Sequence, residues 1–331
     1  MKKIAYLYYR SWSYEILKFL TKAQAQRGDF EISDVIVPKN LSDDWSFLNQ
    51  TTSVHKIDPN NKNELINILS GSDIELVFCF SWSWILSDEI VENYHCICLH
   101  PSKLPKYRGG SPIQNQVFDG ILESAVSVFK MNSGVDSGPI YKQKKLNLDS
   151  PIEEIFRKMS DIGKNISNDL ISDYENNTLV FYEQNDHNST IFKRRKPSDS
   201  FMSFKEIANI NFDDFQRKVN ILRKPYPNLY VNFSNYFLEI SQIHFFNFFP
   251  PGSLVLNKKS LVEDIKNKSA QKHRKETLKA IRPQLLEMML GEPQLGAAYT
   301  AIKRGDLPDA YEYQLLNKLS KTEGSDPNKI D

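Results

Sequence analysis

The sequence has few cysteines and no long apolar segment. Its three cysteines, at positions 79, 96 and 98, are too few for a disulfide framework, which favours a reduced compartment. No stretch approaches the about 20 apolar residues of a membrane span. The apolar run at the N-terminus is short and ends at Arg10, which is typical of a strand and not of a signal peptide. We therefore expect a cytoplasmic protein without a membrane partner.

The chain also lacks a charge excess and the common cofactor motifs. Its net charge is +1, from 42 Lys and Arg against 41 Asp and Glu. Nucleic-acid binding usually requires a basic excess, so we expect no nucleic-acid partner. No G-x-G-x-x-G or P-loop motif is present, which leaves a nicotinamide or ATP site without support. No set of Cys and His has the spacing of a zinc site, and we expect no metal.

Phe and Trp are missing from about the last quarter of the chain. All 20 Phe and all 4 Trp lie at or before position 249. Pro and Gly punctuate several helical patterns beyond that point. We interpret residues 256–331 as a separate helical C-terminal segment. It is either a tail docked on the body or on a second subunit, a regulatory or partner-binding module, or an artificial fusion.

Short apolar runs alternate with helical patterns in the first half. Strands are predicted at 4–9, 32–38, 74–81 and 95–100, and helices at 13–26 and 61–72. This alternation predicts an α/β fold with a Rossmann-like, mostly parallel sheet and helices on both faces. In such sheets ligands bind at the carboxyl ends of the strands, where "CFS" and "CLHPS" are expected to lie.

The second half mixes further strands and helices. Strands are predicted at 123–131 and 139–148, a long amphipathic helix at 150–174, a polar connection at 192–204 and a helix at 212–222. Three further runs, at 229–233, 236–246 and 253–256, predict a small antiparallel unit. This unit is expected to be a second, smaller domain or an appended flap.

His100 stands at the end of a predicted strand, followed by a run rich in Pro and Gly. Histidine titrates near neutral pH and is the commonest general base. Further along, Asp136 lies on a loop between Gly134 and Gly138. A carboxylate that faces a histidine orients the imidazole and stabilises its charged form. The alternatives are a structural histidine and an ordinary turn residue.

Two blocks around these residues resemble a known family. "LHPSKLPKYRGGSP" followed by "FKMNSGVDSGPIY" is similar to the signature of the formyltransferases that use 10-formyltetrahydrofolate. That family includes enzymes acting on methionyl-tRNA, on glycinamide ribonucleotide and on nucleotide-linked sugars. "RRKPSDSFMSF" and "LRKPYPNLYV" resemble the junction in its longer members. The resemblance covers about residues 1–250 and does not extend to 256–331.

The resemblance implies a domain organisation and a mechanism. Residues 1–200 would form the catalytic domain, and residues 201–255 a small α+β or β-hairpin region that mediates a homodimer. A formyl group would pass from the co-substrate 10-formyltetrahydrofolate to an amine. His100 would take the amine proton, Asp136 would hold the imidazole, and the Leu104–Pro105 bond would be cis.

Position 98 departs from the family, which has an Asn there whose amide donates to the oxyanion. Cys98 offers a weaker donor, and losing one oxyanion donor typically costs about a hundred- to a thousandfold in rate. The chain is then a slowed enzyme, an enzyme with a substitute donor, or a relative that only binds ligand. A nucleophilic Cys98–His100 pair is disfavoured, on the expectation that the two side chains point apart.

The loop after the strand at 74–81 would bind the pterin of the folate. The implied cofactor residues are Phe80, Trp82, Trp84, Ile85 and Leu86, together with Gly134 on the loop of Asp136. The alternative is that the aromatic residues belong to the core.

Among acceptors, the resemblance favours a nucleotide-linked amino sugar, a 4-amino-4,6-dideoxyhexose used for surface polysaccharide such as lipopolysaccharide O-antigen. The near-neutral charge and the absence of a "GTP"-like turn in "YYRSWSYEIL" count against a tRNA enzyme. Arg10, Lys103, Tyr107 and Arg108 would meet the diphosphate or the sugar, although Arg108 alternatively holds its own loop together. The other hypotheses are a methionyl-tRNA formyltransferase-like enzyme and a non-catalytic folate- or nucleotide-sugar-binding relative.

Overall fold

The computed structural model describes residues 1–240 except 204–205, 207–208 and 234–235. The predicted strand at 253–256 and the C-terminal segment 256–331 therefore lie outside the described residues. The chain divides into two compact units, Met1–Arg194 and Arg195–Asp331.

A seven-stranded sheet forms the first unit, in the order β3-β2-β1-β4-β5-β7-β8. Its strands are β1 (Lys2–Leu7), β2 (Phe30–Pro38), β3 (Ser53–Ile57), β4 (Leu76–Phe80), β5 (His95–His100), β7 (Glu123–Lys130) and β8 (Ile140–Asn147). The five strands from β3 to β5 run parallel, and β7 and β8 complete the sheet in antiparallel pairing. The predicted α/β fold with a mostly parallel sheet is confirmed.

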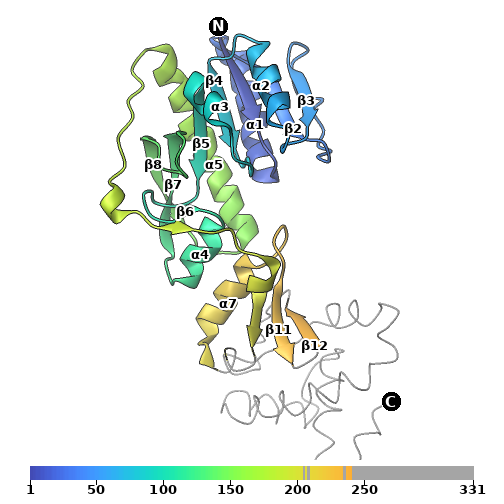
Figure 1. Cartoon of the computed structure of the whole chain (residues 1–331), viewed down its shortest axis with the longest axis vertical. Coiled ribbons are helices and arrows are strands. Elements are labelled where there is room, and N and C mark those ends of the chain that lie inside the picture. The colour runs from blue at the N-terminus through green and yellow to red at the C-terminus, as the bar shows by residue number, and fades with distance from the viewer. Residues whose placement is uncertain (204–205, 207–208, 234–235, 241–331) are drawn as a thin grey trace, which may run out of the picture. The chain divides into compact units, whose positions relative to one another are not determined.

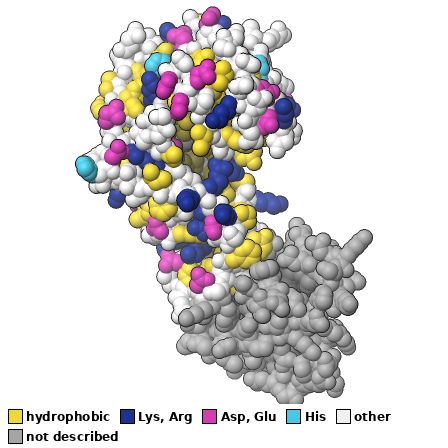
Figure 2. All heavy atoms as spheres, in the orientation of Figure 1, with side chains coloured by type: hydrophobic (Ala, Val, Ile, Leu, Met, Phe, Trp, Pro, Cys, Tyr) yellow, Lys and Arg dark blue, Asp and Glu magenta, His cyan; other side chains and the backbone are white. Residues whose placement is uncertain are grey.

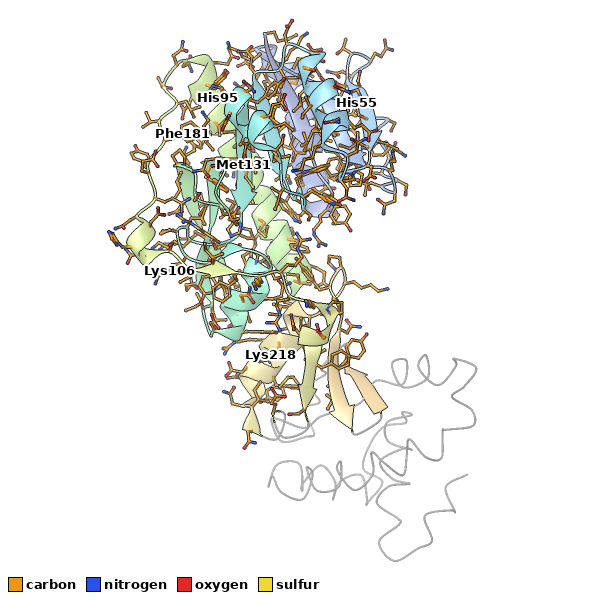
Figure 3. The ribbon with its side chains drawn as sticks, in the orientation of Figure 1. His55, His95, Lys106, Met131, Phe181 and Lys218 are labelled. Atoms are coloured by element: carbon orange, nitrogen blue, oxygen red, sulfur yellow. The ribbon has the colours of Figure 1, made fainter. Side chains whose placement is uncertain are left out.

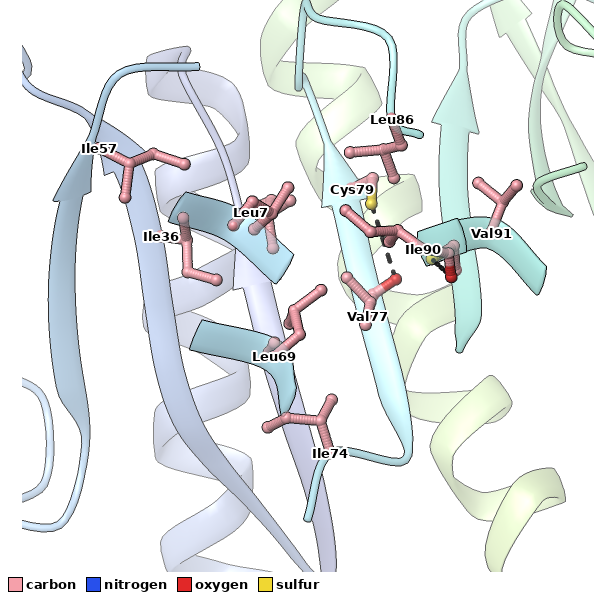
Figure 4. Close-up of a cluster of buried hydrophobic side chains, with 13 residues drawn as sticks. Leu7, Ile36, Ile57, Leu69, Ile74, Val77, Cys79, Leu86, Ile90 and Val91 are labelled. Carbon is pink, nitrogen blue, oxygen red and sulfur yellow. Dashed lines mark hydrogen bonds between the residues drawn. The ribbon is translucent and has the colours of Figure 1, made fainter. Parts of the chain in front are cut away.

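Helices cover both faces of this sheet (Figure 1). The helices of the first unit are α1 (Ser11–Arg27), α2 (Lys62–Ser70), α3 (Asp88–Asn93), α4 (Pro112–Phe118) and α5 (Ile152–Glu175). Helices α2 and α3 lie on one face, and α1 and α5 on the other (Figure 4). Helix α5 approaches closely at Gly163, where an added Cβ would lie 2.4 Å from Cδ1 of Ile16 on α1. A larger residue at this helix crossing would require the side chains of Ile16 and Leu99 to shift.

The core follows from the all-apolar strands at the centre of the sheet. Every residue of β4, "LVFCF", is buried, as expected for a parallel strand covered on both faces. Val77 and Cys79 pack into the cluster beneath α2 and α3 (Figure 4). Phe78 and Phe80 point to the other face, and their rings stack 5.0 Å apart. Because successive side chains of β4 are packed on opposite faces of the sheet, the position of the last residue of β4, where the next loop begins, is fixed.

The elements of the first unit that were not predicted include strand β3 and helices α3 and α4. Strand β3, "SVHKI", is an edge strand whose residues are mostly exposed, so it has no apolar run. Helix α3 has 6 residues and helix α4 has 7, which is too short to show a helical period. The strand predicted at 95–100 coincides with β5, His95–His100.

The second unit contains a three-stranded sheet in the order β10-β11-β12. Its elements are β10 (Phe201–Ser203), α7 (Phe212–Ile221), β11 (Leu229–Phe233) and β12 (Tyr236–Ile240). Strands β11 and β12 pair antiparallel as predicted. Strand β10 lies in a stretch predicted to be a connection, and it pairs parallel with β11. Its 3 residues are too few to produce a strand pattern in the sequence.

The described helices and the visible surface carry two further observations. None of the helices in the described ranges has both the length and the apolar character that crossing a membrane requires. The face of the first unit in Figure 2 carries acidic and basic side chains interspersed with one another.

Candidate functional site

The candidate site lies at the carboxyl ends of neighbouring parallel strands. Strands β1, β4 and β5 are adjacent and end at Leu7, Phe80 and His100. Between β1 and β4 the strand order reverses direction, which is where open α/β sheets bind their ligands. The loops after these strands carry most of the residues singled out from the sequence.

His100 and Asp136 meet at this edge. The imidazole Nδ1 of His100 lies 3.4 Å from Oδ2 of Asp136, and the two side chains are only 7% and 18% exposed. The other ring nitrogen, Nε2, lies 2.8 Å from the backbone carbonyl oxygen of Tyr107. Both nitrogens of the ring therefore face oxygen atoms that accept hydrogen bonds.

The contacts of the His100 ring decide which nitrogen can receive a proton. A backbone carbonyl only accepts, so Nε2 must carry the hydrogen of the neutral ring and donate it to Tyr107. The lone pair is then on Nδ1, the nitrogen that faces Asp136. A proton taken up by His100 arrives beside a carboxylate, which stabilises the resulting imidazolium.

The Asp136 loop is fixed by contacts with its surroundings. Asp136 adopts a φ of 48°, in the left-handed region that non-glycine residues seldom occupy. The backbone N–H of Gly109 donates to its Oδ2 at 2.7 Å. Gly138 lies where a Cβ would come within 1.8 Å of the carbonyl oxygen of Lys130. The short connection between β7 and β8 thus holds the carboxylate against His100.

The Pro- and Gly-rich run after His100 is pinned to a later segment. Strand β6 (Arg108–Gly109) pairs with β9 (Ile191–Phe192). Gly109 has a φ of 89°, and a Cβ on it would lie 2.3 Å from the carbonyl oxygen of Phe192. The two backbones therefore approach each other closely at Gly109. The Leu104–Pro105 bond is cis, as the resemblance implied.

The residues expected to meet substrate have different surroundings. Lys103 is exposed, and the Arg10 guanidinium lies over the ring of Tyr9 at 5.3 Å. Tyr107 stacks on Phe192 with 5.0 Å between ring centroids. Burial and its hydrogen bond to Asp119 raise the pKa of Tyr107 to about 12, so its hydroxyl stays protonated.

Arg108 is the most enclosed of these candidates. Its side chain is 5% exposed and donates to the side chains of Gln184 and Asp186. These contacts favour the alternative that Arg108 holds its own loop together.

Cys98 lies on the same side of β5 as His100. The expectation that the two side chains point apart was wrong, because residues i and i+2 of a strand share one face. Burial, and secondarily the nearby charge of Asp136, raise the pKa of the Cys98 thiol well above its ordinary value. The sulfur therefore remains an S–H group, which is a weak donor and a poor nucleophile.

The loop after β4 presents aromatic side chains at the same edge. Ser81, with a φ of 63°, accepts hydrogen bonds from the backbone N–H groups of Tyr9 and Arg10. The rings of Trp82 and Trp84 lie 5.0 Å apart, and Trp84 packs edge-on against Tyr9 at 5.3 Å. We call Tyr9, Trp82 and Trp84 the aromatic cluster.

The remaining implied cofactor residues fall into two groups. Phe80 is 0% exposed and Leu86 is 6% exposed, so both pack in the core. Ile85 is 84% exposed beside the aromatic cluster. Gly134 lies on the exposed part of the Asp136 loop, where its N–H donates to Asn132. Both indoles are half-buried, and Trp82 also packs against the buried cluster of the first unit.

Two site residues were missed from the sequence, Ser81 and Gln184. Both lie in stretches whose pattern signals only a loop, and their partners are distant in sequence. No signal in a single sequence marks either one. Across the described residues, no three His, Cys, Asp or Glu side chains gather as metal ligands would. Figure 3 shows three of the other side chains, His55, His95 and Met131, spread over the sheet of the first unit.

Comparison with known protein families shows which family the segment around the site resembles. Residues 37–168 match the family model described as formyl transferase. This segment is similar to a formyl transferase domain. His100 and Asp136 both lie inside it, and so does Cys98. The formyltransferases are an enzyme family, and folate is their typical co-substrate.

Individual relatives of the formyl transferase domain differ in acceptor. The methionyl-tRNA formyltransferase of Rickettsia typhi is 26% identical over 203 residues, which cover 59% of this chain and 65% of that protein. The chain thus spans just under two thirds of the length of this curated relative. The solved methionyl-tRNA formyltransferase from Clostridium thermocellum is 26% identical with a TM-score of 0.56, over 75% of this chain and 95% of that one.

A sugar enzyme shares the fold. The structure of WlaRD, a sugar 3N-formyl transferase, in the presence of dTDP and 5-N-formyl-THF, is 20% identical with a TM-score of 0.52. The match covers 77% of this chain and 90% of that one. At this identity the likeness extends to the fold alone.

Proposed function

We propose that the protein transfers a formyl group from 10-formyltetrahydrofolate to the amine of a nucleotide-linked amino sugar. The observation that carries the reaction class is the His100–Asp136 contact at a strand end within the formyl transferase domain. His100 is the base, Asp136 its charge partner and Cys98 the neighbouring donor.

Binding of the folate falls to the aromatic cluster. When bound, the co-substrate supplies the formyl carbon. Trp82 and Trp84 offer half-buried indole faces on which a pterin ring can stack, and Ile85 extends the apolar surface. Phe80 and Leu86 support this surface from the core. The Ser81 hydroxyl ties the cluster to the turn after β1 through two backbone N–H groups.

The tautomer of His100 determines which ring nitrogen accepts the proton of the amine. The amine nitrogen forms a bond to the formyl carbon and loses a proton, which His100 accepts at Nδ1. Asp136 stabilises the imidazolium that results. The bond between the formyl carbon and the folate nitrogen breaks, and His100 returns its proton to that nitrogen. The ring ends neutral, so no external acid or base is consumed.

Cys98 is the point at which this site departs from the formyltransferase pattern. Its S–H group reaches the same side of β5 as His100 but donates more weakly than an amide. We expect an active enzyme that is slower than one carrying Asn at this position.

Two acceptors are each supported by an observation. The near balance of 42 basic and 41 acidic residues supports an amino sugar over tRNA, and Arg10 and Lys103 offer cations for a diphosphate. A 4-amino-4,6-dideoxyhexose for surface polysaccharide is the specific acceptor proposed. Methionyl-tRNA is the second candidate, because two relatives at 26% identity carry that name.

A formyl-transfer assay tests both acceptors. The protein is incubated with 10-formyltetrahydrofolate and either a panel of nucleotide-linked amino sugars or charged initiator tRNA, and products are read by mass. One added formyl group on one sugar is expected, and none with His100→Asn. Formylation of the tRNA alone would replace the sugar by the second candidate. No product in either arm would reject the transferase proposal.

The domain organisation is part of the same proposal. Residues 1–200 catalyse, residues 201–255 mediate a homodimer, and residues 256–331 form a separate segment. Sedimentation of the full chain and of a chain ending at 255 tests this: a dimer is expected in both, and a monomer of the shorter chain would contradict it.

A further inference from the structure

Gln184 bridges two loops of the site. It belongs to the segment between α5 and β9, far in sequence from both loops. Its amide Nε2 donates to the backbone carbonyl oxygens of Asp136, at 2.8 Å, and of Gly138, at 2.7 Å. Its Oε1 accepts from Nε and Nη2 of Arg108, at 3.1 and 2.7 Å. One half-buried side chain thus contacts both the Asp136 loop and the Arg108 loop.

The residues on either side of Arg108 touch the His100–Asp136 pair. The carbonyl of Tyr107 accepts from Nε2 of His100, and the N–H of Gly109 donates to Oδ2 of Asp136. Gln184 therefore closes a ring of contacts that runs from His100 through Asp136, Gln184 and Arg108 back to His100. A shift of either loop would change the distance between the imidazole and the carboxylate.

The chemistry of Gln184 matches its partners. The two carbonyls only accept hydrogen bonds, and a guanidinium only donates them. A primary amide supplies both a donor pair and an acceptor on one planar group. A carboxylate at this position would face the two carbonyls without a donor, and an apolar side chain would bond to neither loop.

Asp136 needs such support because its backbone is strained. A φ of 48° costs a non-glycine residue free energy and persists only where the surroundings hold it. We propose that Gln184 is a positioning residue, which holds Asp136 and the Tyr107 carbonyl in place so that His100 keeps its hydrogen on Nε2 and its lone pair toward Asp136. This inference rests on the proposed function.

Kinetics provide the first test, with a matched control. Asp186 contacts the same Arg108 at 2.7 Å, but it is 77% exposed and forms a solvent-screened pair. Gln184→Met is expected to lower kcat about 10- to 100-fold with KM for both substrates within about threefold, because a misplaced base costs rate without removing a substrate contact. Asp186→Asn is expected to stay within about twofold of wild type.

A double-mutant cycle separates positioning from general stability. If Gln184 acts through Asp136, then adding Gln184→Met to Asp136→Asn changes kcat by less than about twofold. A full multiplicative loss in the double variant would overturn the inference. So would a loss in Gln184→Met that Asp186→Asn reproduces.

The third measurement does not need turnover. In ¹⁵N NMR spectra, wild type should show His100 as the Nε2–H tautomer, assigned by its loss in His100→Gln. Gln184→Met should show a mixture of tautomers, and Asp186→Asn should not. An unchanged tautomer in Gln184→Met overturns the inference even where formyl transfer is intact. Absence of transfer in wild type with the expected NMR change rejects the proposed function and keeps the role of Gln184.

Discussion

Nδ1 of His100 lies 3.4 Å from Oδ2 of Asp136, although His100 ends strand β5 and Asp136 lies in the connection between β7 and β8. Strand β7 runs antiparallel to β5 and ends at Lys130 beside Ile97, so the loop that follows it starts next to the amino-terminal half of β5 and folds back to reach His100. The pair exists because the loop between β7 and β8 folds back along β5 far enough for Asp136 to reach the last residue of that strand.

Removing the carboxylate charge should slow the reaction. Asp136→Asn leaves the imidazolium without its partner, and kcat is expected to fall about 100- to 10,000-fold. Asp73→Asn is the control for loss of one negative charge, because Asp73 is exposed and precedes the opposite end of β4. Steady-state kinetics with a circular-dichroism check of folding measure the effect. Equal rates in the two variants would remove Asp136 from the mechanism.

Restoring the amide at position 98 should speed the reaction. Cys98→Asn replaces a weak S–H donor by an N–H donor, and kcat is expected to rise at least about tenfold. Cys98→Ala removes the donor, so its kcat should fall below that of wild type. The kcat of Cys98→Ser should lie between those of Cys98→Ala and Cys98→Asn. Single-turnover rates of the series decide the matter. If all four proteins react equally fast, another group supplies the donor.

Stability should fall in alkaline solution. Burial holds the pKa of Cys98 above its ordinary value of 9.0. The pKa of the Cys79 thiol is also raised, by its contact with Cys96 and by burial. Above pH 9 the unfolded chain loses these protons while the folded chain keeps them, so the unfolding free energy falls as pH rises. The expected loss between pH 9 and 10 is about 1–3 kcal/mol.

Urea unfolding under reducing conditions measures this pH dependence. Cys98→Ser removes one of the titrating thiols and should make the pH dependence shallower. A wild-type stability that does not change between pH 8 and 10 would show that the buried thiols do not titrate differently on unfolding.

Gly109, which pairs with Phe192 of β9, should not tolerate replacement by alanine. In Gly109→Ala the φ of 89° becomes strained, because the residue now has a side chain. The added Cβ would also lie 2.3 Å from the Phe192 carbonyl oxygen. Gly120→Ala is the matched control, since its φ is 76° with nothing within 4 Å of the added Cβ. The control should cost about 1 kcal/mol and Gly109→Ala more than about 2 kcal/mol, measured by denaturant unfolding. Equal costs would show that β9 moves aside freely.

Core and binding aromatics should respond differently to truncation. Trp84→Ala should weaken binding of 5-formyltetrahydrofolate about tenfold, at the scale of about 1–3 kcal/mol for a stacking ring, with a small effect on stability. Phe80→Ala should instead cost about 3–5 kcal/mol of stability, because Phe80 is fully buried. Calorimetric titration and thermal unfolding separate the two. Unchanged folate affinity in Trp84→Ala would exclude stacking on that ring.

The sequence by itself determined the sheet and the edge at which the site lies. Apolar runs such as "LVFCF" and "HCICLH" mark β4 and β5 because burial and side-chain alternation leave a local signature. His100 was predicted from its place at the end of a strand, and Asp136 from its place between two glycines. Edge strand β3 and the short helices α3 and α4 escaped prediction, because few of their residues form a repeating apolar pattern.

Only the tertiary structure decided which side chains share the site. It separated Phe80, which packs in the core, from Trp84, which lies against Tyr9, although Phe80 ends the apolar run that Trp84 closely follows. It turned Arg108 inward and brought Gln184 to the Asp136 loop. Strands and helices are encoded by neighbours along the chain. Hydrogen bonds between loops depend on backbone positions that exist only after the sheet has assembled, so no local pattern announces them.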